Sequence, residues 1–459
     1  MSLLFYRFFL LLYYTGIRIL AVWNFKAKLW VQGRKTFPAI DYSKTNNKVV
    51  WMHCASLGEF EQGRPLVETI KLNYPASIII ISFFSPSGYE ITKKFKEADH
   101  IFYLPEDSAA NAKRLIHQIN PSLVLWVKYE YWFYYLRELK KNNIPTLLIS
   151  GVYRPNMPFF KWYGVLWKKM LQSFTHFFVQ NLQSKTTLAK VVQADKITHA
   201  GDTRFDRVIS IAEKFDDIPG IKKFCNNQCV VVAGSTWEDD EAEWIHYVKI
   251  HPEIKFIIAP HEIDKENLAD VKKKFPTSIF YSEWIAASSQ QSAVSNEQSV
   301  VRSQRSVIRE QQSTGNDQRS TINCLIIDNI GMLSRLYKYA TVCYVGGGFR
   351  SDGLHNILEA AVYGKPVIFG PEFEKNFEAI EMMEHGGAIC INNAVELEKI
   401  LNQLLNNEKY LNETGKAAGN YVYNNAGATK KIMEFIKKNA FLPVDQNLLQ
   451  KDQNPSSLS

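Results

Sequence analysis

The sequence predicts an α/β protein with two doubly wound parallel sheets. Short apolar runs, typical of buried strands, alternate with helix-like segments from residue 48 to residue 150. The alternation begins again at residue 228 and continues to residue 371. Strands that are separated by helices form parallel sheets with helices on both faces, so the repeated pattern indicates two domains of this kind.

The predicted elements follow the chain in order. The run 77–84, SIIIISFF, is apolar throughout, as in a strand that is buried on both faces, and residues 62–74 read as a helix. Ligands of such sheets bind at the carboxyl ends of the strands, so we expect the two sheets to face a cleft. Strands are predicted at 48–56, 77–84, 100–107, 122–132 and 144–150, and then at 228–236, 255–262, 323–329, 341–348 and 365–371.

The domain boundary is expected in the polar stretch 207–227, which contains Pro219 and Gly220. The chain then divides into an N-terminal anchor helix with a basic flank (1–35), a first domain (36–212), a second domain (213–439) and a polar tail (440–459).

Residues 285–321 interrupt the second domain with a degenerate seven-residue repeat. Its apolar residues are adjacent pairs, such as Val300–Val301 and Val307–Ile308, and adjacent pairs make a poor coiled-coil seam. We interpret the segment as a disordered surface insertion without a catalytic role.

The composition excludes several classes of protein. With 46% apolar and 22% charged residues, the 459-residue chain can bury sizeable cores, which excludes a disordered or fibrous protein. The net charge, 54 − 46 = +8, favours phosphates, anionic lipid or nucleic acid as partners. The six cysteines form no CxxC pair, which favours a reduced environment over a disulfide scaffold. No metal-ligand cluster of strong spacing, P-loop or GxSxG motif is present in the sequence.

The N-terminal stretch 3–31 is long and apolar enough to contact a membrane. Arg7, Arg18 and Tyr14 fall on nearly the same helix face, which suits a helix lying in the membrane interface, or one whose charged stripe packs against protein. A plain transmembrane anchor remains an alternative, whereas a cleaved signal peptide is disfavoured because no small-x-small cleavage site precedes the basic run. That run, which suits the cytoplasmic leaflet, consists of Lys26, Lys28, Arg34 and Lys35.

The segment 53–59, HCASLGE, joins a predicted strand to a helix and is the first candidate site. Its small residues allow a tight turn, which would place Glu59 at the lip of the cleft. A carboxylate there can accept a proton from an attacking hydroxyl group. The alternative is a glutamate that only complements the helix dipole.

A second candidate lies at 345–360, where a strand ends in Gly346, Gly347 and Gly348 and a helix is predicted to start near Asn356. Glycines let backbone N–H groups approach a phosphate, and a helix N-terminus favours its charge. Glu359 would lie one turn into that helix, where it can accept both hydroxyls of a ribose. The glycines do not match GxGxxG, so a nicotinamide enzyme is not indicated; an ordinary Gly-rich turn is the alternative.

Two further segments have a functional and a structural interpretation. Arg204 lies between Asp202 and Asp206, so it can either meet an anion or form a structural ion pair. Aromatic residues and lysines interleave in 153–174, as in an acceptor groove, a lipid-contacting surface or an amphipathic core helix.

Together these segments resemble the 3-deoxy-D-manno-octulosonic acid (Kdo) transferases of lipopolysaccharide biosynthesis. The resemblance extends from the N-terminal helix to about residue 430, without the insertion. It rests on Gly33-Arg34-Lys35, HCASLGE (53–59), GDTRFD (201–206), AGSTWEDDE (233–241) and HNILEAAVYGKPVIFGP (355–371).

The resemblance implies a GT-B architecture of two Rossmann-like domains. It implies transfer of Kdo from CMP-Kdo to the lipid A precursor (lipid IVA) with inversion, without a cofactor or a metal, at the cytoplasmic side of the inner membrane and without nucleic acid as a partner. Glu59 matches the general base and Arg204 a residue that stabilises the transition state. Matched to CMP binding are Pro260, His261, Ile330, Gly331, Met332, Asn356, Ile357, Leu358 and Glu359.

The sequence departs from the family pattern at three places. His261 and Glu262 follow Pro260 where the family usually has Pro-Arg-His, so a permanent cation is lost at a phosphate site, and Arg350 is our candidate to replace it. Where the family usually has two carboxylates flanking one residue, this chain has Lys128 and Glu130, which we assign to the catalytic group. Met332 replaces a usual glutamate, which a backbone contact would tolerate.

Other functions fit parts of this pattern. A GT-B transferase that uses a UDP-sugar shares the fold, and so does a nucleotide-sugar epimerase, although the apolar N-terminal helix speaks against a soluble epimerase. A membrane-tethered nucleic-acid-binding protein fits the charge, but no binding motif supports it.

Overall fold

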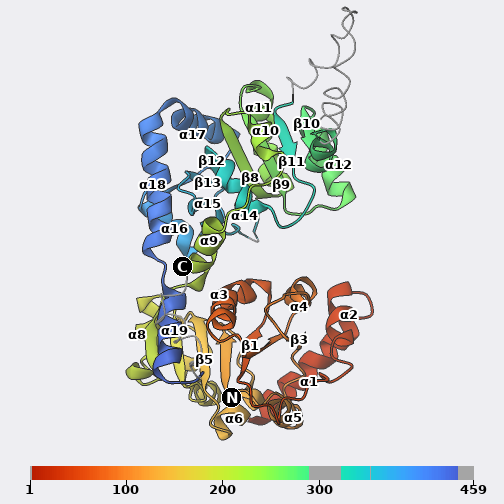
Figure 1. Cartoon of the computed structure of the whole chain (residues 1–459), viewed down its shortest axis with the longest axis vertical. Helices are drawn as coiled ribbons and strands as arrows, with labels where there is room; N and C mark the ends of the chain where they lie inside the picture. The colour runs from red at the N-terminus through yellow and green to blue at the C-terminus, as the bar shows by residue number, and fades with distance from the viewer. Residues whose placement is uncertain (1–2, 289–321, 352, 443–459) are drawn as a thin grey trace, which may run out of the picture. The chain divides into compact units, whose positions relative to one another are not determined.

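The computed structural model describes residues 3–288, 322–351 and 353–442 (Figure 1). The chain forms two compact units, Met1–Arg207 with Ala426–Ser459, and Val208–Asn425. Each unit contains one parallel seven-stranded sheet, which confirms the two doubly wound domains. Residues 426–438 lie with the first unit, whereas the sequence placed the end of the second domain at residue 439.

The first sheet has the strand order β3-β2-β1-β4-β5-β6-β7. Its central strand β1 pairs with β2 on one side and β4 on the other, and every residue of β1 is buried. The strands are β1 (Val49–Cys54), β2 (Ile78–Phe83), β3 (His100–Tyr103), β4 (Leu123–Val127), β5 (Thr146–Gly151), β6 (His176–Val179) and β7 (Ile197–His199).

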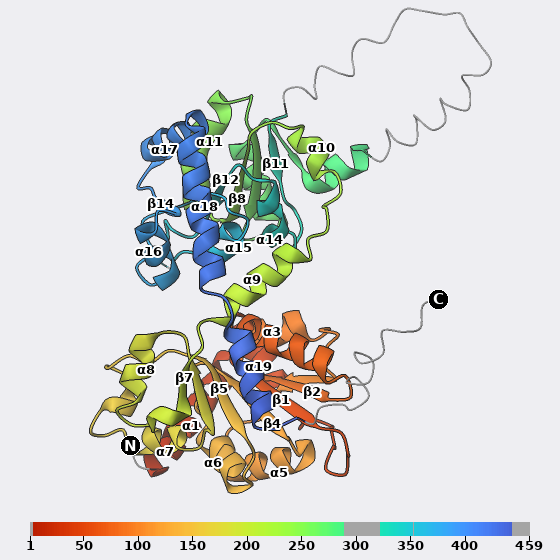
Figure 2. The same ribbon diagram turned by 60° about the vertical axis from the view of Figure 1, so that its left-hand side comes forward.

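Helices cover both faces of this sheet because alternate strand residues point to opposite sides. Trp51 and Trp126 pack with α1, α5, α6 and α7, whereas Met52 and Val127 pack with α3 and α19. Figure 2 shows the ribbon of these helices around the sheet. The helices are α1 (Leu3–Leu20), α2 (Phe25–Gln32), α3 (Leu57–Asn73), α4 (Pro86–Thr92), α5 (Ala109–Ile119), α6 (Phe133–Lys141), α7 (Val165–Leu171), α8 (Leu182–Leu188) and α19 (Ala428–Lys438). Helix α9 (Thr203–Glu213) begins in this unit, and its residues from Val208 on belong to the second unit.

The second sheet has the order β10-β11-β9-β8-β12-β13-β14. One face packs on α11, α12 and α17. The strands are β8 (Val230–Thr236), β9 (Lys255–Pro260), β10 (Ser278–Phe280), β11 (Cys324–Ile326), β12 (Val342–Val345), β13 (Val367–Phe369) and β14 (Ala388–Cys390). The helices are α10 (Ile221–Cys225), α11 (Glu238–Ile250), α12 (Lys265–Lys274), α14 (Leu333–Leu336), α15 (Leu358–Ala361), α16 (Phe377–Glu384), α17 (Ala394–Asn406) and α18 (Glu408–Asn424).

The structure adds short strands that the sequence did not predict. β6, β7, β10 and β14 have three or four residues each and lie at or next to a sheet edge, where a short run lacks a clear apolar pattern. Residues 281–288 are helical, which corrects the first part of the predicted disordered insertion. The rest of that insertion, and the tail beyond residue 442, lie outside the described residues.

Helix α1 packs on the first unit along one face and exposes a wide apolar face. Tyr6, Leu10 and Tyr14, spaced one helical turn apart, are buried in the core. By length and composition the helix could cross a membrane. Its opposite face and the turn after it expose Leu4, Phe5, Phe8, Phe9, Leu11, Leu12, Ile19, Leu20, Val22, Trp23 and Phe25.

Polar contacts hold α1 to the unit near both of its ends. Tyr6 Oη donates to Asp107 Oδ2 at 2.6 Å, and the Asp107 N–H donates to Tyr14 Oη at 2.9 Å. The Asp107 carboxylate also accepts N–H groups at the start of α6 and so caps that helix. The charged stripe therefore faces protein: Arg7 contacts Tyr134, and Arg18 pairs with Glu106.

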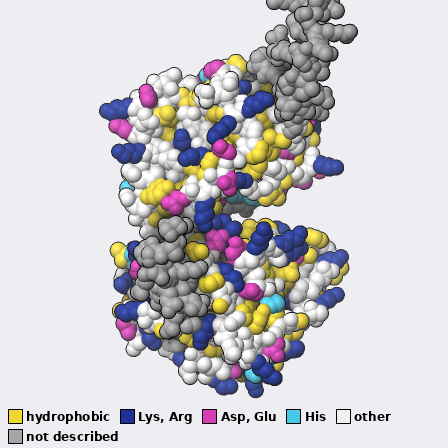
Figure 3. Space-filling view, viewed as in Figure 1, with side chains coloured by type: hydrophobic (Ala, Val, Ile, Leu, Met, Phe, Trp, Pro, Cys, Tyr) yellow, Lys and Arg dark blue, Asp and Glu magenta, His cyan; other side chains and the backbone are white. Residues whose placement is uncertain are grey.

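The basic residues after α1 do not form one exposed surface, because Arg34 is bound within the unit while the lysines are exposed. Arg34 donates to the carbonyls of Leu104 and Phe84 at 2.8 and 2.7 Å, and its guanidinium lies 3.9 Å from the Trp30 ring centroid. The side chain thus ties α2 to the loops after β2 and β3. Lys26, Lys28 and Lys35 remain exposed, and Figure 3 shows basic and hydrophobic side chains intermingled on the visible face of the first unit.

Candidate functional site

The candidate residues of the first unit gather where the strand order of its sheet reverses. This switch point lies between β1 and β4, and in open parallel sheets ligands bind there, beyond the carboxyl ends of the strands. Glu59 follows β1, Lys128 and Glu130 follow β4, and Arg204 follows β7. The fold therefore brings to one edge residues that are far apart in the sequence.

Glu59 lies in the first turn of α3 and folds back toward the strand it follows. Its carboxylate accepts the backbone N–H of Ala55, and the residue is 8% exposed. Burial, and next the negative charge of Glu130, raise its pKa to about 7, whereas the Ala55 N–H and the charge of Lys128 lower it. At neutral pH the carboxyl group therefore exchanges a proton readily, as a general base must.

Glu130 is held by aromatic and histidine donors from the sheet. Its Oε2 accepts from His53 Nε2 at 2.8 Å and from Trp132 Nε1 at 3.0 Å, and its carbonyl accepts from Trp126 Nε1. His53 is fully buried on β1. These contacts fix the carboxylate in one orientation at the switch point.

Lys128 has an unusual backbone at the end of β4. Its φ of +61° is in the left-handed region, which a lysine adopts rarely and at an energetic cost. Backbone strain of this kind is common at functional sites, where the fold holds a side chain in one direction. The strand itself ends at Val127, whereas the sequence predicted a strand to residue 132. The ammonium charge lowers the pKa of both Glu59 and Asp202.

Arg204 forms the ion pair that was the alternative interpretation of its segment. Its Nε and Nη2 atoms lie 2.8 Å from Asp202 Oδ2, and Asp202 also accepts from Gln180 Nε2 at 2.8 Å. Burial raises the pKa of Asp202, but the guanidinium charge and the hydrogen bonds of Arg204 outweigh burial and keep that pKa below its usual value. Arg204 is therefore oriented by Asp202 at the edge of the sheet, and 27% of its side chain remains exposed.

In the second unit the switch point lies between β8 and β12, and an aromatic cluster occupies it. His261, after β9, stacks on both Trp237 and His355, with ring centroids 4.5 Å from each, and the centroids of those two rings lie 6.4 Å apart. Trp237 Nε1 donates to His355 Nε2 at 3.0 Å, and the Arg350 guanidinium lies 4.2 Å from the Trp237 ring centroid. This contact places Arg350 beside His261, the position where the family's usual arginine is missing.

The two histidines of this cluster are neutral at pH 7. Burial, and next the neighbouring His261, lower the pKa of His355 to about 4. Burial also lowers the pKa of His261, and Arg350 adds to the effect while Glu262 opposes it. The positive charge of the cluster at neutral pH is therefore that of Arg350.

The glycines after β12 are required by close backbone contacts. A Cβ on Gly346 would lie 2.3 Å from the Ser235 carbonyl oxygen, and one on Gly348 would lie 2.5 Å from the Gly370 nitrogen. The buried Asp240 accepts the Gly347 N–H at 2.8 Å and so anchors the bend to α11. The glycine run thus lets the loop after β12 pack closely against the end of β8 and the loop after β13.

The predicted helix start near Asn356 is corrected by the structure. Helix α15 begins at Leu358 and has four residues, so its dipole is small. Asn356 Nδ2 donates to Glu359 Oε1 at 3.1 Å, which orients that carboxylate. Ile357 and Leu358 are buried and fix the turn.

The turn 330–332 is open on its outer side. Ile330 is 83% exposed, and Gly331 has a φ of +94° with no atom near the position of a Cβ. Met332 is buried and occupies the N-cap position of α14. Its side chain therefore packs inward, so a ligand would meet the backbone of this turn.

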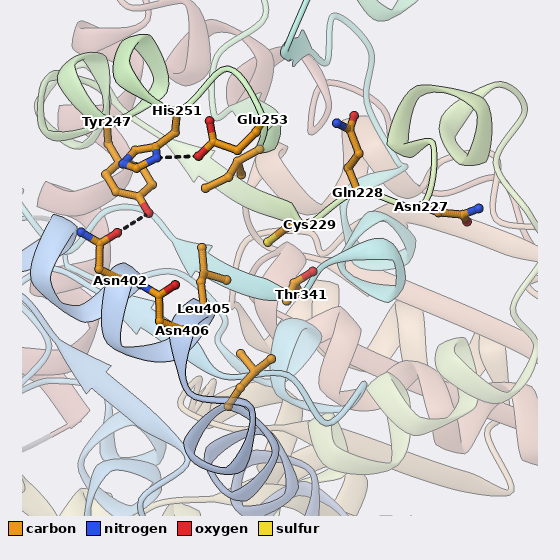
Figure 4. A pocket seen from close by; sticks show the side chains of 12 residues that line it. Asn227, Gln228, Cys229, Tyr247, His251, Glu253, Thr341, Asn402, Leu405 and Asn406 are labelled. Atoms are coloured by element: carbon orange, nitrogen blue, oxygen red, sulfur yellow. Dashed lines mark hydrogen bonds and ion pairs between the residues drawn. The ribbon is translucent and has the colours of Figure 1, made fainter.

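A separate pocket of about 490 Å³ lies at the opposite edge of the second sheet (Figure 4). Cys229 and Thr341 line it from the amino ends of β8 and β12, and Tyr247 donates to Asn402 at 3.0 Å across it. None of the predicted site residues lines this pocket.

The segment 153–174 is divided between core and surface. Tyr153, Phe159 and Phe174 are buried in the first unit, whereas Trp162 and Tyr163 are exposed at its tip. The core-helix interpretation therefore holds for its ends, and the tip is open to solvent.

Sequence reasoning missed His53, Trp237 and His355 as functional candidates. Each lies in one of the sequence motifs described above. Each becomes a candidate only through its contacts with residues that are distant in the sequence. A buried polar residue inside an apolar strand, as at His53, was the available signal.

Comparison with known proteins identifies relatives of this chain. The family model of 3-Deoxy-D-manno-octulosonic-acid transferase (kdotransferase) matches residues 31–207. The 3-deoxy-D-manno-octulosonic acid transferase of Aquifex aeolicus is 25% identical over 401 residues, which cover 84% of this chain and 94% of the relative. A bifunctional glycosyltransferase/methyltransferase of Fusobacterium nucleatum is 27% identical over 383 residues, which cover 80% of this chain. The match spans about half of that relative, 54% of its length.

Among solved structures, UDP-GlcNAc 2-epimerase from Neisseria meningitidis, bound to UDP-GlcNAc, has a TM-score of 0.57 and 16% identity, covering 85% of this chain and 100% of that chain. This likeness concerns the fold alone.

The two parallel seven-stranded sheets give the chain a GT-B-like architecture. The family model and the Kdo transferase relatives, rather than the fold, support a glycosyltransferase. The chain is a relative of the Kdo transferases of lipopolysaccharide biosynthesis, and the resemblance predicted from its motifs is confirmed.

Proposed function

We propose that the protein transfers Kdo from CMP-Kdo to the lipid A precursor, lipid IVA, with inversion at the anomeric carbon. The observation that carries this proposal is Glu59, a buried carboxyl group at the switch point of the first sheet with a pKa of about 7. The family resemblance supplies the donor and the acceptor.

The proposed reaction is a single displacement. An acceptor hydroxyl oxygen bonds to the anomeric carbon of Kdo as the bond from that carbon to the phosphate oxygen breaks, and CMP leaves with the electron pair. Glu59 takes the hydroxyl proton late in the step, which typically contributes about 10²–10⁴ in rate. We propose that Lys128, oriented Arg204 and Glu130 set the charge around this proton transfer.

The donor is proposed to bind at the switch point of the second sheet. Glu359, oriented by Asn356, would accept the ribose hydroxyls, and the backbone of 330–332 with Pro260 and His261 would contact the rest of CMP. Arg350 would meet the phosphate. We propose that no cofactor and no metal takes part, because CMP leaves as a stabilised anion, and that EDTA leaves transfer unchanged.

The acceptor is a lipid, and we propose that α1 lies in the membrane interface at the cytoplasmic face of the inner membrane. The helix is held to the first unit near both ends, through Tyr6 and Arg18, so its exposed apolar face would lie along the lipid surface. Trp23 and Phe25, with exposed lysines beside them, suit the headgroup region.

Mass spectrometry of lipid IVA after incubation with CMP-Kdo and the full-length protein tests the proposal. We expect a product heavier by Kdo, and an unchanged lipid would contradict it. The Glu59→Gln variant should bind CMP normally and form product about 10²–10⁴-fold more slowly. Competition by CMP but not by UDP separates this function from a transferase or epimerase that uses a UDP-sugar.

A further inference from the structure

A buried chain of hydrogen bonds runs through the first sheet to the candidate base site. Trp51 Nε1 donates to Ser82 Oγ at 2.9 Å, Ser82 Oγ lies 2.9 Å from His53 Nδ1, and His53 Nε2 lies 2.8 Å from Glu130 Oε2. Trp51, Ser82 and His53 are fully buried. A serine, a histidine and an acid are thus aligned, but Ser82 lies inside β2, where no substrate can reach it, so the alignment is not a nucleophilic triad.

The hydrogen-bond partners assign the histidine tautomer. In the described structure, Ser82 Oγ accepts the indole N–H of Trp51, so its own hydroxyl hydrogen is available for His53 Nδ1. If His53 Nδ1 carried the proton instead, it could not accept the Ser82 hydroxyl hydrogen. That buried hydrogen would then lack this acceptor, which costs free energy. The proton of His53 therefore lies on Nε2 and points to Glu130.

The register of the sheet keeps this arrangement rigid. His53 pairs with Ser82 on one side and with Trp126 on the other, and its ring lies 4.5 Å from the Trp126 ring. Neighbouring strands thus hold both ring nitrogens in place.

We propose that His53 is a positioning residue of the transfer reaction: its Nε2–H holds the Glu130 carboxylate in one orientation at the end of β4, the strand next to the one that Glu59 follows. The proposal rests on the proposed function of Glu59 as the base. Its electrostatic link is the charge of Glu130, which ranks next to burial among the causes that raise the pKa of Glu59.

Other groups face these two carboxyls and act alongside His53. Lys128 opposes the effect of Glu130 on Glu59. The remaining titratable neighbours are Cys54 on β1 and Tyr129 and Tyr131 after β4 around Glu59, and Arg34 after α2 and Tyr13 on α1 around Glu130. All of these neighbouring side chains stay present when only residue 53 is replaced.

The test compares His53→Phe with His53→Gln. Phenylalanine removes both ring nitrogens, so the Glu130 carboxylate loses the donor that holds it in place and its charge acts less on Glu59. The pKa of Glu59 should then fall by about 0.5–1 unit. Glutamine can still place an N–H near Glu130 and should restore most of the wild-type titration. The matched control is His176→Phe, which removes a buried histidine of β6 that bonds Thr198 and should leave Glu59 unchanged.

Two readouts separate this proposal from the proposed function. Nuclear magnetic resonance of the full-length protein with ¹³C-labelled glutamate carboxyls follows Glu59 directly, assigned by its loss in Glu59→Gln. The pH profile of Kdo transfer should show its acid limb shifted by the same amount, with kcat lowered more than KM is changed. If the wild type transfers no Kdo, the proposed function fails while the titration still decides the role of His53. An unshifted Glu59 titration in folded His53→Phe, or a shift of equal size in His176→Phe, would overturn the inference.

Discussion

The Glu59→Gln substitution should make the first unit more stable at alkaline pH while it slows transfer by about 10²–10⁴-fold. A glutamine at this position would keep the size of the side chain and an oxygen that accepts the Ala55 N–H, but the substitution removes a buried charge beside Glu130. Because the folded pKa of Glu59 is raised from 4.5 to about 7, the wild type loses stability as pH rises between these values. Each pKa unit corresponds to about 1.36 kcal/mol, so the loss amounts to about 3 kcal/mol above pH 7.

The predicted gain in stability appears only where Glu59 is ionised, so the assay compares two pH values. Thermal unfolding of both proteins in detergent is measured at about pH 4.5, where Glu59 is protonated in the folded state, and at about pH 8.5, where it is ionised. The melting temperatures should agree within about 2 °C at the lower pH, and the variant should melt higher by roughly 6–12 °C at the upper pH. The matched control is Glu434→Gln, an exposed carboxyl group on α19 of the same unit, which should show no pH-dependent gain.

The reasoning is refuted if Glu59→Gln has the same stability increment at both pH values, because Glu59 would then carry no penalty for its charge. It is also refuted if the variant retains transfer within about tenfold of the wild type, because the stability effect would then be unrelated to a catalytic base.

Four further outcomes are expected. Glu359→Ala should weaken CMP binding by about 10- to 100-fold in calorimetry, since charge-assisted hydrogen bonds to the ribose are lost; unchanged affinity would remove that role. Arg350→Ala should weaken CMP binding but leave cytidine binding unchanged, since the phosphate is the group it is proposed to meet. Lys128→Glu should raise the pKa of Glu59 and move the acid limb of the transfer profile to higher pH, and a shift to lower pH would contradict the assigned sign. Asp107→Asn should speed amide hydrogen exchange in residues 3–20, because an amide cannot accept from Tyr6 and the α6 N–H groups together; equal exchange rates would show that α1 is held by apolar packing alone.

The sequence predicted the switch-point residues because strand and turn chemistry are local. An apolar strand followed by small residues and a carboxylate, as at 53–59, places Glu59 at a sheet edge whatever the rest of the chain does. The three glycines after β12 can likewise be recognised in the sequence. The close backbone contacts that require Gly346 and Gly348 can be recognised only in the structure.

The predicted helix start at Asn356 shows where local pattern is insufficient. The residues after it favour a helix, but the chain makes a single turn from Leu358 to Ala361, because the following segment must return to form β13. The same limit explains the short edge strands, whose pairing partners and not their own composition make them strands.

What the sequence by itself determined is the α/β class, the motifs and the resemblance to the Kdo transferases, because periodicity and turn residues are properties of short segments. What only the tertiary structure decided is the charge at each position: that Arg204 is paired with Asp202, that His53 points its proton at Glu130, and that burial raises the pKa of Glu59. Proton affinity depends on burial and on neighbours from other strands, and folding alone brings those together.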